Sequence, residues 1–229
     1  MNHSPEKPSP QGGIEVKICG LTRADDARYC VEQGAAAVGM VFYAKSPRCV
    51  SPDQGREICC TVGTRAARVG VFVDAGFDAI VEAAEYCGLN MVQLHGEEPP
   101  RLAERLHRHG LEVIKALFVR RRPHFDVAGR YPVRACLLEC GSGKLPGGTG
   151  RHWDTRPARS LCRQFPVIVA GGLCPQNVAR AVTACRPAGV DVSSGVERRP
   201  GVKDRDKIKQ FMTAVAACNS GPRAERIFS

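Results

Sequence analysis

The feature that most restricts the fold is an alternation of short apolar runs with stretches of helical spacing, repeated about eight times along the 229 residues. The runs are rich in β-branched residues. They cover residues 14–19, 37–43, 67–73, 90–95, 112–117, 133–139, 166–171 and 189–194. Strands that alternate with helices predict a parallel sheet, and eight such units favour a closed (β/α)8 barrel over an open doubly wound sheet.

Helical periodicity follows the runs, and the last helix is expected over residues 204–217. Its inner face would carry Ile208, Phe211, Met212 and Val215. No Pro/Gly linker or change in composition marks a second domain, so one barrel is predicted over residues 14–218. We expect a disordered N-terminal tail at 1–13, where the sequence is MNHSPEKPSPQGG, and a polar C-terminal tail at 219–229.

Composition excludes several classes of protein. No apolar stretch approaches the roughly 18 residues of a membrane helix, and the first residues lack the apolar region of a signal peptide, so a cytoplasmic protein without membrane association is expected. The twelve cysteines are scattered without a CxxC pair, so neither a zinc site nor a disulfide framework is indicated. Any one cysteine remains a candidate catalytic thiol.

The net charge of +10 raises the question of nucleic-acid binding. The arginines are mostly dispersed, the densest cluster is 120–122, and an aromatic content of 6% offers no evident stacking platform. A basic surface that attracts an anionic small substrate is the favoured interpretation. We expect no specific nucleic-acid partner.

In a (β/α)8 barrel, active-site groups lie at the carboxyl ends of the strands. The side chains to consider are therefore those that close the apolar runs, and the chemically versatile ones are Cys19, His95 and Glu139. After the last two runs, glycines and hydroxyls would present backbone N–H groups to an anion at the starts of the next helices. These residues are Gly171, Gly172, Asp191, Ser193, Ser194 and Gly195. A phosphorylated substrate is the leading prediction, and tight turns that need glycine are the alternative.

Glu139 opens into a glycine-rich segment, CGSGKLPGGTG, at residues 140–150. A Walker A loop would need Ser or Thr where Leu145 stands, and a dinucleotide fingerprint would need glycine where Pro146 or Trp153 stands. The segment is therefore predicted to be a flexible loop that covers a ligand.

Seven ordered motifs together resemble one enzyme family. They are KICGLT (17–22), GMVFYAKSPRCVS (39–51), VGVFVD (69–74), VQLHGEE (92–98), GGTG (147–150), VAGGLCPQNV (169–178) and GVDVSSGVERRPGVKD (189–204). The sequence resembles phosphoribosylanthranilate isomerase of tryptophan biosynthesis over nearly the whole barrel. The resemblance implies an Amadori rearrangement of N-(5'-phosphoribosyl)anthranilate to the 1-deoxyribulose 5-phosphate form, without metal or redox cofactor.

The resemblance also implies residue roles. Cys19 of KICG matches the general base, and Arg48 of the SPR segment matches the arginine that binds the anthranilate carboxylate. A guanidinium can meet a carboxylate with two parallel hydrogen bonds. His95, in VQLHGEE, is expected to contact the substrate.

The general acid is where this sequence departs from the family. The family has Leu-Leu-Asp at the end of strand six, and here Glu139 follows Leu137 and Leu138. Asp and Glu have similar ordinary pKa values of about 3.9 and 4.3, but one added methylene moves the carboxyl by roughly 1 Å, which can cost about a hundredfold in rate. Glu139 is expected to be the acid in a slightly rearranged pocket, with slow turnover.

The alternative is a sugar-phosphate-binding barrel whose substrate has changed or whose catalysis is impaired. Asp154 does not replace the acid, since it matches an acidic residue that the family already has. We expect a monomer, with a homodimer as the alternative, and a small phosphorylated molecule as the only partner.

Overall fold

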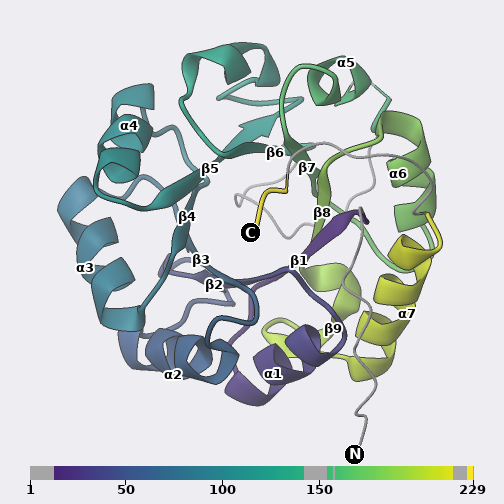
Figure 1. Ribbon diagram of the computed structural model, residues 1–229, viewed down its shortest axis with the longest axis horizontal. Coiled ribbons are helices and arrows are strands. Elements are labelled where there is room, and N and C mark those ends of the chain that lie inside the picture. The colour runs from purple at the N-terminus through teal and green to yellow at the C-terminus, as the bar shows by residue number, and fades with distance from the viewer. Residues whose placement is uncertain (1–12, 142–153, 157, 219–225, 229) are drawn as a thin grey trace, which may run out of the picture.

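The computed structural model describes residues 13–141, 154–156, 158–218 and 226–228. Eight parallel strands close into a barrel in chain order, and helices surround it (Figure 1). The strands are β1 (Glu15–Cys19), β2 (Ala37–Val41), β3 (Ala67–Phe72), β4 (Met91–Leu94), β5 (Glu112–Phe118), β6 (Ala135–Glu139), β7 (Val167–Val169) and β8 (Gly189–Val192). The predicted (β/α)8 barrel is confirmed.

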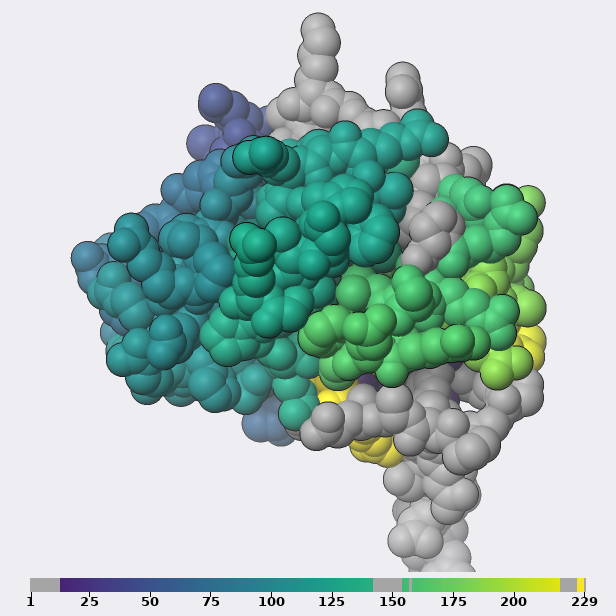
Figure 2. Space-filling model, turned by 90° about the horizontal axis from the view of Figure 1, so that it is seen from above, coloured from purple at the N-terminus to yellow at the C-terminus, as the bar shows by residue number. Residues whose placement is uncertain are grey.

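An α-helix follows every strand except β5. The α-helices are α1 (Ala24–Glu32), α2 (Pro52–Val62), α3 (Phe77–Cys87), α4 (Pro100–Arg108), α5 (Ala158–Cys162), α6 (Val178–Cys185) and α7 (Arg205–Ala216). The colour changes in chain order around the flank in Figure 2, so consecutive units lie side by side. Among the described helices, none is both long and apolar enough to cross a membrane.

Local sequence explains where individual helices begin and end. Ser51 accepts a hydrogen bond from the backbone of Gln54, whose side chain accepts one in return, so α2 begins with a capping box. Asp204 caps α7 by accepting from two backbone N–H groups. The last helix therefore lies one residue inside each end of the expected range, 204–217.

The fifth unit corrects one expectation. Helical stretches were expected after every strand, but the described residues after β5 form a six-residue 3-10 helix, η1 (Phe125–Arg130). Pro123 lacks a backbone donor and Gly129 disfavours a helix, which limits this segment to a short 3-10 turn. After β8, a 3-10 turn η2 (Ser194–Val196) and a hairpin of β9 (Glu197–Arg199) and β10 (Val202–Lys203) precede α7.

Alternation along the strands decides which side chains enter the barrel. In β6, Ala135 and Leu137 belong to the interior cluster, whereas Cys136 and Leu138 pack under the helices. Because the side-chain period of a strand is two, Glu139 points to the inside. The same argument places Lys17 and Cys19 inside the barrel, since Val16 and Ile18 pack in the outer cluster.

The amino end of the barrel is covered by residues 226–228. Ile227 is 1% exposed and packs in the interior cluster with residues such as Ile168. Arg134 donates a hydrogen bond to the Ile227 carbonyl over 3.3 Å. This part of the expected polar tail at 219–229 is therefore packed against the barrel, and in Figure 1 the yellow C-terminal segment lies within the ring of strands. The rest of that tail and residues 1–12 lie outside the described residues.

Candidate active site

A cavity of ≈ 80 Å³ lies at the carboxyl ends of the strands. Nine of the ten predicted site residues line it: Cys19, Arg48, His95, Glu139, Gly171, Gly172, Asp191, Ser193 and Ser194. Pockets that enclose a drug-sized ligand usually measure about 300–1,000 Å³, so this cavity corresponds to the floor of a site that continues upward. Of the glycine-rich segment predicted at 140–150 to cover a ligand, residues 142–150 lie outside the described residues.

A larger hollow of ≈ 1730 Å³ lies at the opposite end of the barrel. It is lined by residues at the amino ends of strands, such as Glu15 and Ala67, and contains none of the predicted site residues. Size alone would select this hollow, but the titratable groups and the glycine loops gather at the smaller cavity. The carboxyl end of the barrel is therefore the candidate site.

Cys19 ends β1 with its thiol inside the barrel, 7% exposed. The neighbouring strand makes room for it, because a Cβ added at Gly39 would lie 2.8 Å from the sulfur. Burial raises the pKa of the Cys19 thiol, and the nearby ammonium of Lys17 opposes that effect. Formation of a Cys19 thiolate thus depends on the positive charges around it.

Lys17 and Asp191 form a buried ion pair across the junction of the first and last strands. Their side chains meet at 2.8 Å, and the two residues are partners in the β1–β8 register. This contact does not favour the expectation that Asp191 belongs to the phosphate-binding set, which stays untested. Its carboxylate is an acceptor that would repel a phosphate, and its observed contact is with the Lys17 ammonium.

Arg48 is held by a carboxylate that sequence reasoning did not single out. Its Nε and Nη2 donate to the two carboxylate oxygens of Glu197 over 2.9 and 2.7 Å, a bidentate pair in which both residues are buried. The hydrogen bonds from Arg48 and the charge of Lys203 outweigh burial and hold the pKa of Glu197 below its usual value. Within the described residues, Nη1 of Arg48 makes no hydrogen bond, and Arg48 lines the cavity.

Glu139 ends β6 on another wall of the cavity, 4% exposed. Its carboxylate lies 3.5 Å from Nε2 of His95, which is close enough for an ionic contact but does not form a hydrogen bond. The amide of Gln93 lies 2.7 Å from the other ring nitrogen, Nδ1. When Gln93 donates to Nδ1, the neutral ring carries its proton on Nε2, on the side of Glu139.

Arg121 is a further neighbour of the acid that sequence reasoning missed. Its guanidinium lies 3.5 Å from the ring centre of Phe118, and its buried Nη2 has no hydrogen-bond partner among the described residues. Burial lowers the pKa of Arg121, and the charge of Glu139 opposes that shift. Of the basic cluster at 120–122, this member is thus half-buried beside the site, whereas Arg120 and Arg122 are exposed.

The predicted phosphate loops meet at one corner of the cavity. Gly171 and Gly172 adopt φ values of +86° and +70°, which favour glycine. A Cβ at Gly195 would lie 1.9 Å from the Leu173 carbonyl, so the loop after β8 packs directly on the loop after β7. The backbone N–H groups of Gly171, Gly172, Ser194 and Gly195 make no hydrogen bond to other described residues.

The expected placement at helix starts needs correction. Helix α6 begins at Val178, six residues after Gly172, and Ser194 opens only the three-residue turn η2. The N–H groups available to an anion therefore belong to loops rather than to α-helix N-termini. Among the residues that the structure describes, no group of three or more His, Cys, Asp or Glu side chains is placed to hold a metal ion.

Sequence reasoning identified the residues that line the cavity better than those that support them. Gln93, Glu197 and Lys203 were not singled out, although each lies within a motif quoted for the family resemblance. The available signal was a charged or amide side chain inside an otherwise apolar or glycine-rich motif. Their partners are distant in sequence, so spacing could not reveal their contacts.

Comparisons with known proteins identify the family of this chain. The sequence model of the family described as N-(5'phosphoribosyl)anthranilate (PRA) isomerase matches residues 16–214. An N-(5'-phosphoribosyl)anthranilate isomerase of Desulfatibacillum aliphaticivorans is 46% identical, over 94% of this chain and 99% of the relative. That of Syntrophus aciditrophicus is 41% identical, over 88% of this chain and 86% of the relative.

Solved structures give the same result. The phosphoribosyl anthranilate isomerase of Thermotoga maritima has a TM-score of 0.81 and 39% identity, covering 89% of this chain and 99% of its own. That of Thermus thermophilus has a TM-score of 0.81 and 38% identity, covering 90% and 100%. This chain belongs to the N-(5'-phosphoribosyl)anthranilate isomerase family.

Proposed function

We propose that this protein isomerises N-(5'-phosphoribosyl)anthranilate to 1-(2-carboxyphenylamino)-1-deoxyribulose 5-phosphate, with Cys19 as general base and Glu139 as general acid. The observation that carries the proposal is that both side chains line one cavity, from β1 and β6, together with Arg48 and the glycine loops. One solved relative with a TM-score of 0.79 is described as a complex with the reduced form of that product. The substrate is therefore the same class of phosphorylated ribose derivative.

Glu139 and Cys19 each make one proton transfer on the way to the enolamine, and the final tautomerisation moves a proton from the C2' hydroxyl to C1'. Glu139 protonates the ribose ring oxygen, the C1'–O bond breaks, and the anthranilate nitrogen forms a Schiff base with C1'. The Cys19 thiolate then removes the proton from C2', which gives an enolamine that tautomerises to the ketone. C2' is oxidised and C1' is reduced within the same molecule, so the reaction requires no external oxidant or reductant.

The remaining residues orient the substrate. Arg48 offers Nη1 to the anthranilate carboxylate while Glu197 holds the other edge of the guanidinium. The N–H groups of Gly171, Gly172, Ser194 and Gly195 receive the phosphate, with the Ser193 hydroxyl beside them. His95 contacts the ribose next to Glu139. A substrate bound in this way lies between the base and the acid.

The test is the loss of anthranilate-type fluorescence as substrate is consumed. The wild-type chain should turn over and should rescue a tryptophan auxotroph that lacks this isomerase. Because general acid–base groups contribute about 10²–10⁴-fold each, Cys19→Ala and Glu139→Gln should both lower kcat by amounts in that range. Normal turnover in either variant would remove the role assigned to that residue.

The Cys19 thiol also predicts a direction of pH dependence. Its pKa is raised above the usual value by burial, so the thiolate fraction is small near neutral pH and grows as the pH rises. We expect the rate of Cys19 alkylation by iodoacetamide, which depends on the thiolate alone, to increase with pH between about 6 and 9, by up to tenfold per unit while the pH stays below that pKa. A rate that falls over this interval would contradict a thiolate base.

A second candidate is a barrel that binds sugar phosphates without turnover. The observation that favours this candidate is that the Glu139 carboxylate makes no hydrogen bond with described residues, so nothing fixes its orientation. In that case substrate would raise the melting temperature of the protein while no product formed.

A further inference from the structure

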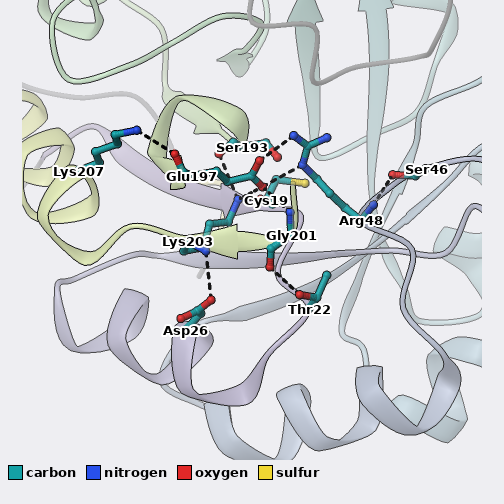
Figure 3. Close-up of polar contacts among 10 residues, drawn as sticks. All are labelled: Cys19, Thr22, Asp26, Ser46, Arg48, Ser193, Glu197, Gly201, Lys203 and Lys207. Atoms are coloured by element: carbon teal, nitrogen blue, oxygen red, sulfur yellow. Dashed lines mark hydrogen bonds and ion pairs between the residues drawn. The ribbon is translucent and has the colours of Figure 1, made fainter. Parts of the chain in front are cut away.

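One lysine links the separate parts of the candidate site. Lys203 in β10 has a fully buried side chain, and its ammonium donates to the Cys19 carbonyl over 2.6 Å, the Ser193 carbonyl over 3.1 Å and Glu197 over 2.9 Å (Figure 3). An ammonium has three donors and no acceptor, so all three are used. Burial lowers the pKa of Lys203 and Glu197 opposes that effect, while the three acceptors fit the charged form.

The hairpin that carries Lys203 is itself fixed on several sides. The Lys203 backbone N–H donates to Asp26 of α1, and the Thr22 hydroxyl donates to the Gly201 carbonyl. From α7, Lys207 donates to the Glu197 carbonyl. Figure 3 shows these contacts surrounding the two strands of the hairpin. The ammonium therefore sits in a framework that can hold it still.

Charge counting shows what the ammonium adds. Glu197 forms ion pairs with two cations, Arg48 and Lys203, so this group of three has one negative and two positive charges. The neighbouring Lys17–Asp191 pair is internally neutral. The groups around the Cys19 thiol thus carry one net positive charge: Lys17 beside it on β1, Asp191 on β8, Lys203 on β10, Arg48 after β2 and Glu197 on β9. Without Lys203 the sum would be zero.

We propose that Lys203 is a positioning residue of the isomerase. Its ammonium fixes the end of β1 at Cys19, the loop after β8 at Ser193 and, through Glu197, the guanidinium of Arg48. It also leaves one net positive charge beside the substrate and the Cys19 thiolate. The proposal rests on the roles given above to Cys19 and Arg48. It assigns a function to the β9–β10 hairpin, which contributes no residue to the cavity lining.

The test compares two variants with opposite expected signs. Lys203→Met removes the positive charge near the thiol, so the rate of Cys19 alkylation by iodoacetamide at a fixed pH should fall at least threefold. Glu197→Gln removes a negative charge and keeps the shape, so the rate should rise. One pKa unit corresponds to a tenfold change in thiolate below the pKa. The rate is followed on the peptide that contains Cys19, by mass spectrometry, with Cys19→Ala as the blank.

Steady-state kinetics supply a second readout. Lys203→Met leaves Arg48 neutralised by Glu197, so KM should rise about tenfold or more. The pH profile of Cys19 alkylation should show its rise at a higher pH. Adding Glu197→Gln to Lys203→Met removes the negative charge that neutralises Arg48 and should recover part of the loss in KM.

Lys115 provides a matched control. It is equally buried and pairs with Glu98 at 2.7 Å, but its other contacts are the carbonyls of Leu94 and Gly96 rather than of Cys19. Lys115→Met should lower the free energy of unfolding without moving the Cys19 alkylation rate.

If Lys203→Met and Lys115→Met behave alike in alkylation and in the pH profile, the proposal is overturned and Lys203 is only structural. Should Lys203→Met not fold, an unchanged or slower alkylation in Glu197→Gln overturns it equally. The alkylation rates do not require turnover. A wild-type chain without isomerase activity would therefore reject the proposed function and still leave the charge effect on Cys19 measurable.

Discussion

The two walls of the candidate site differ in how their polar groups are satisfied. The base side consists of Lys17, Cys19, Arg48, Asp191, Glu197 and Lys203, and its charged groups pair with one another at 2.7–2.9 Å. The acid side consists of Gln93, His95, Arg121 and Glu139. Three of the four unpartnered buried side-chain polar atoms among the described residues belong to it: Gln93 Oε1, His95 Nε2 and Arg121 Nη2.

The difference indicates a division of labour. A network of paired charges is rigid, so the base side can hold the Cys19 thiol and the Arg48 guanidinium, the proposed base and carboxylate-binding group, before substrate arrives. A buried polar atom without a partner costs about 1–3 kcal/mol, and a bound substrate that supplies the partner recovers that energy. We expect mutations on the base side to change both stability and activity, and mutations on the acid side to change activity alone.

The largest effect on stability is expected for Lys17→Met. Removing one partner of a buried ion pair leaves the Asp191 carboxylate uncompensated, so the free energy of unfolding should fall by about 3–5 kcal/mol. Urea denaturation measures it. Adding Asp191→Leu removes the stranded charge and should recover most of the loss. If Lys17→Met lowers the free energy of unfolding by less than about 1 kcal/mol, the base side does not stabilise the fold as the comparison of the two sides requires.

Gln93→Leu should separate activity from stability on the acid side. The amide already leaves Oε1 unpaired, so its removal should change the free energy of unfolding by less than about 1 kcal/mol. His95 would lose the donor to Nδ1 and its tautomers would mix, so kcat should fall about tenfold. Nitrogen NMR of the imidazole would report the tautomer. Destabilisation as large as that of Lys17→Met would contradict the comparison.

The smallest effect is expected for Glu139→Asp. No hydrogen bond from the described residues orients the Glu139 carboxylate, and Asp has one rotatable bond fewer. We expect kcat to rise by a few-fold, up to about tenfold, at unchanged stability, as measured by the fluorescence assay. A drop in kcat would mean that the pocket is adapted to the longer side chain.

Strand order and the strand-end side chains could be predicted from local pattern. Alternation along β1 and β6 is enough to place Cys19 and Glu139 inside the barrel, and the β/α repeat is enough to close it. Asp204 and the periodic apolar residues gave the bounds of α7 to within one residue. These features depend on neighbours a few residues apart.

The supporting contacts could not be predicted because they join distant parts of the chain. Lys17 and Asp191 are 174 residues apart, and Arg48 and Glu197 are 149 apart. Spacing does not indicate which cation meets which carboxylate. For the same reason the sequence neighbours of Asp191 predict a place in the phosphate loop, whereas its side chain forms an ion pair with Lys17 on the adjacent strand β1.

The pairing of β1 with β8 has a consequence for biosynthesis. The base side combines residues that leave the ribosome early with residues that leave it late, since Cys19 precedes Asp191, Glu197 and Lys203 by more than 170 residues. Until then the nascent chain carries this thiol without the ammonium–carboxylate framework that defines its chemistry. The contacts that join β1 to the segment from β8 to β10 can therefore be complete only after residue 203 has been synthesised.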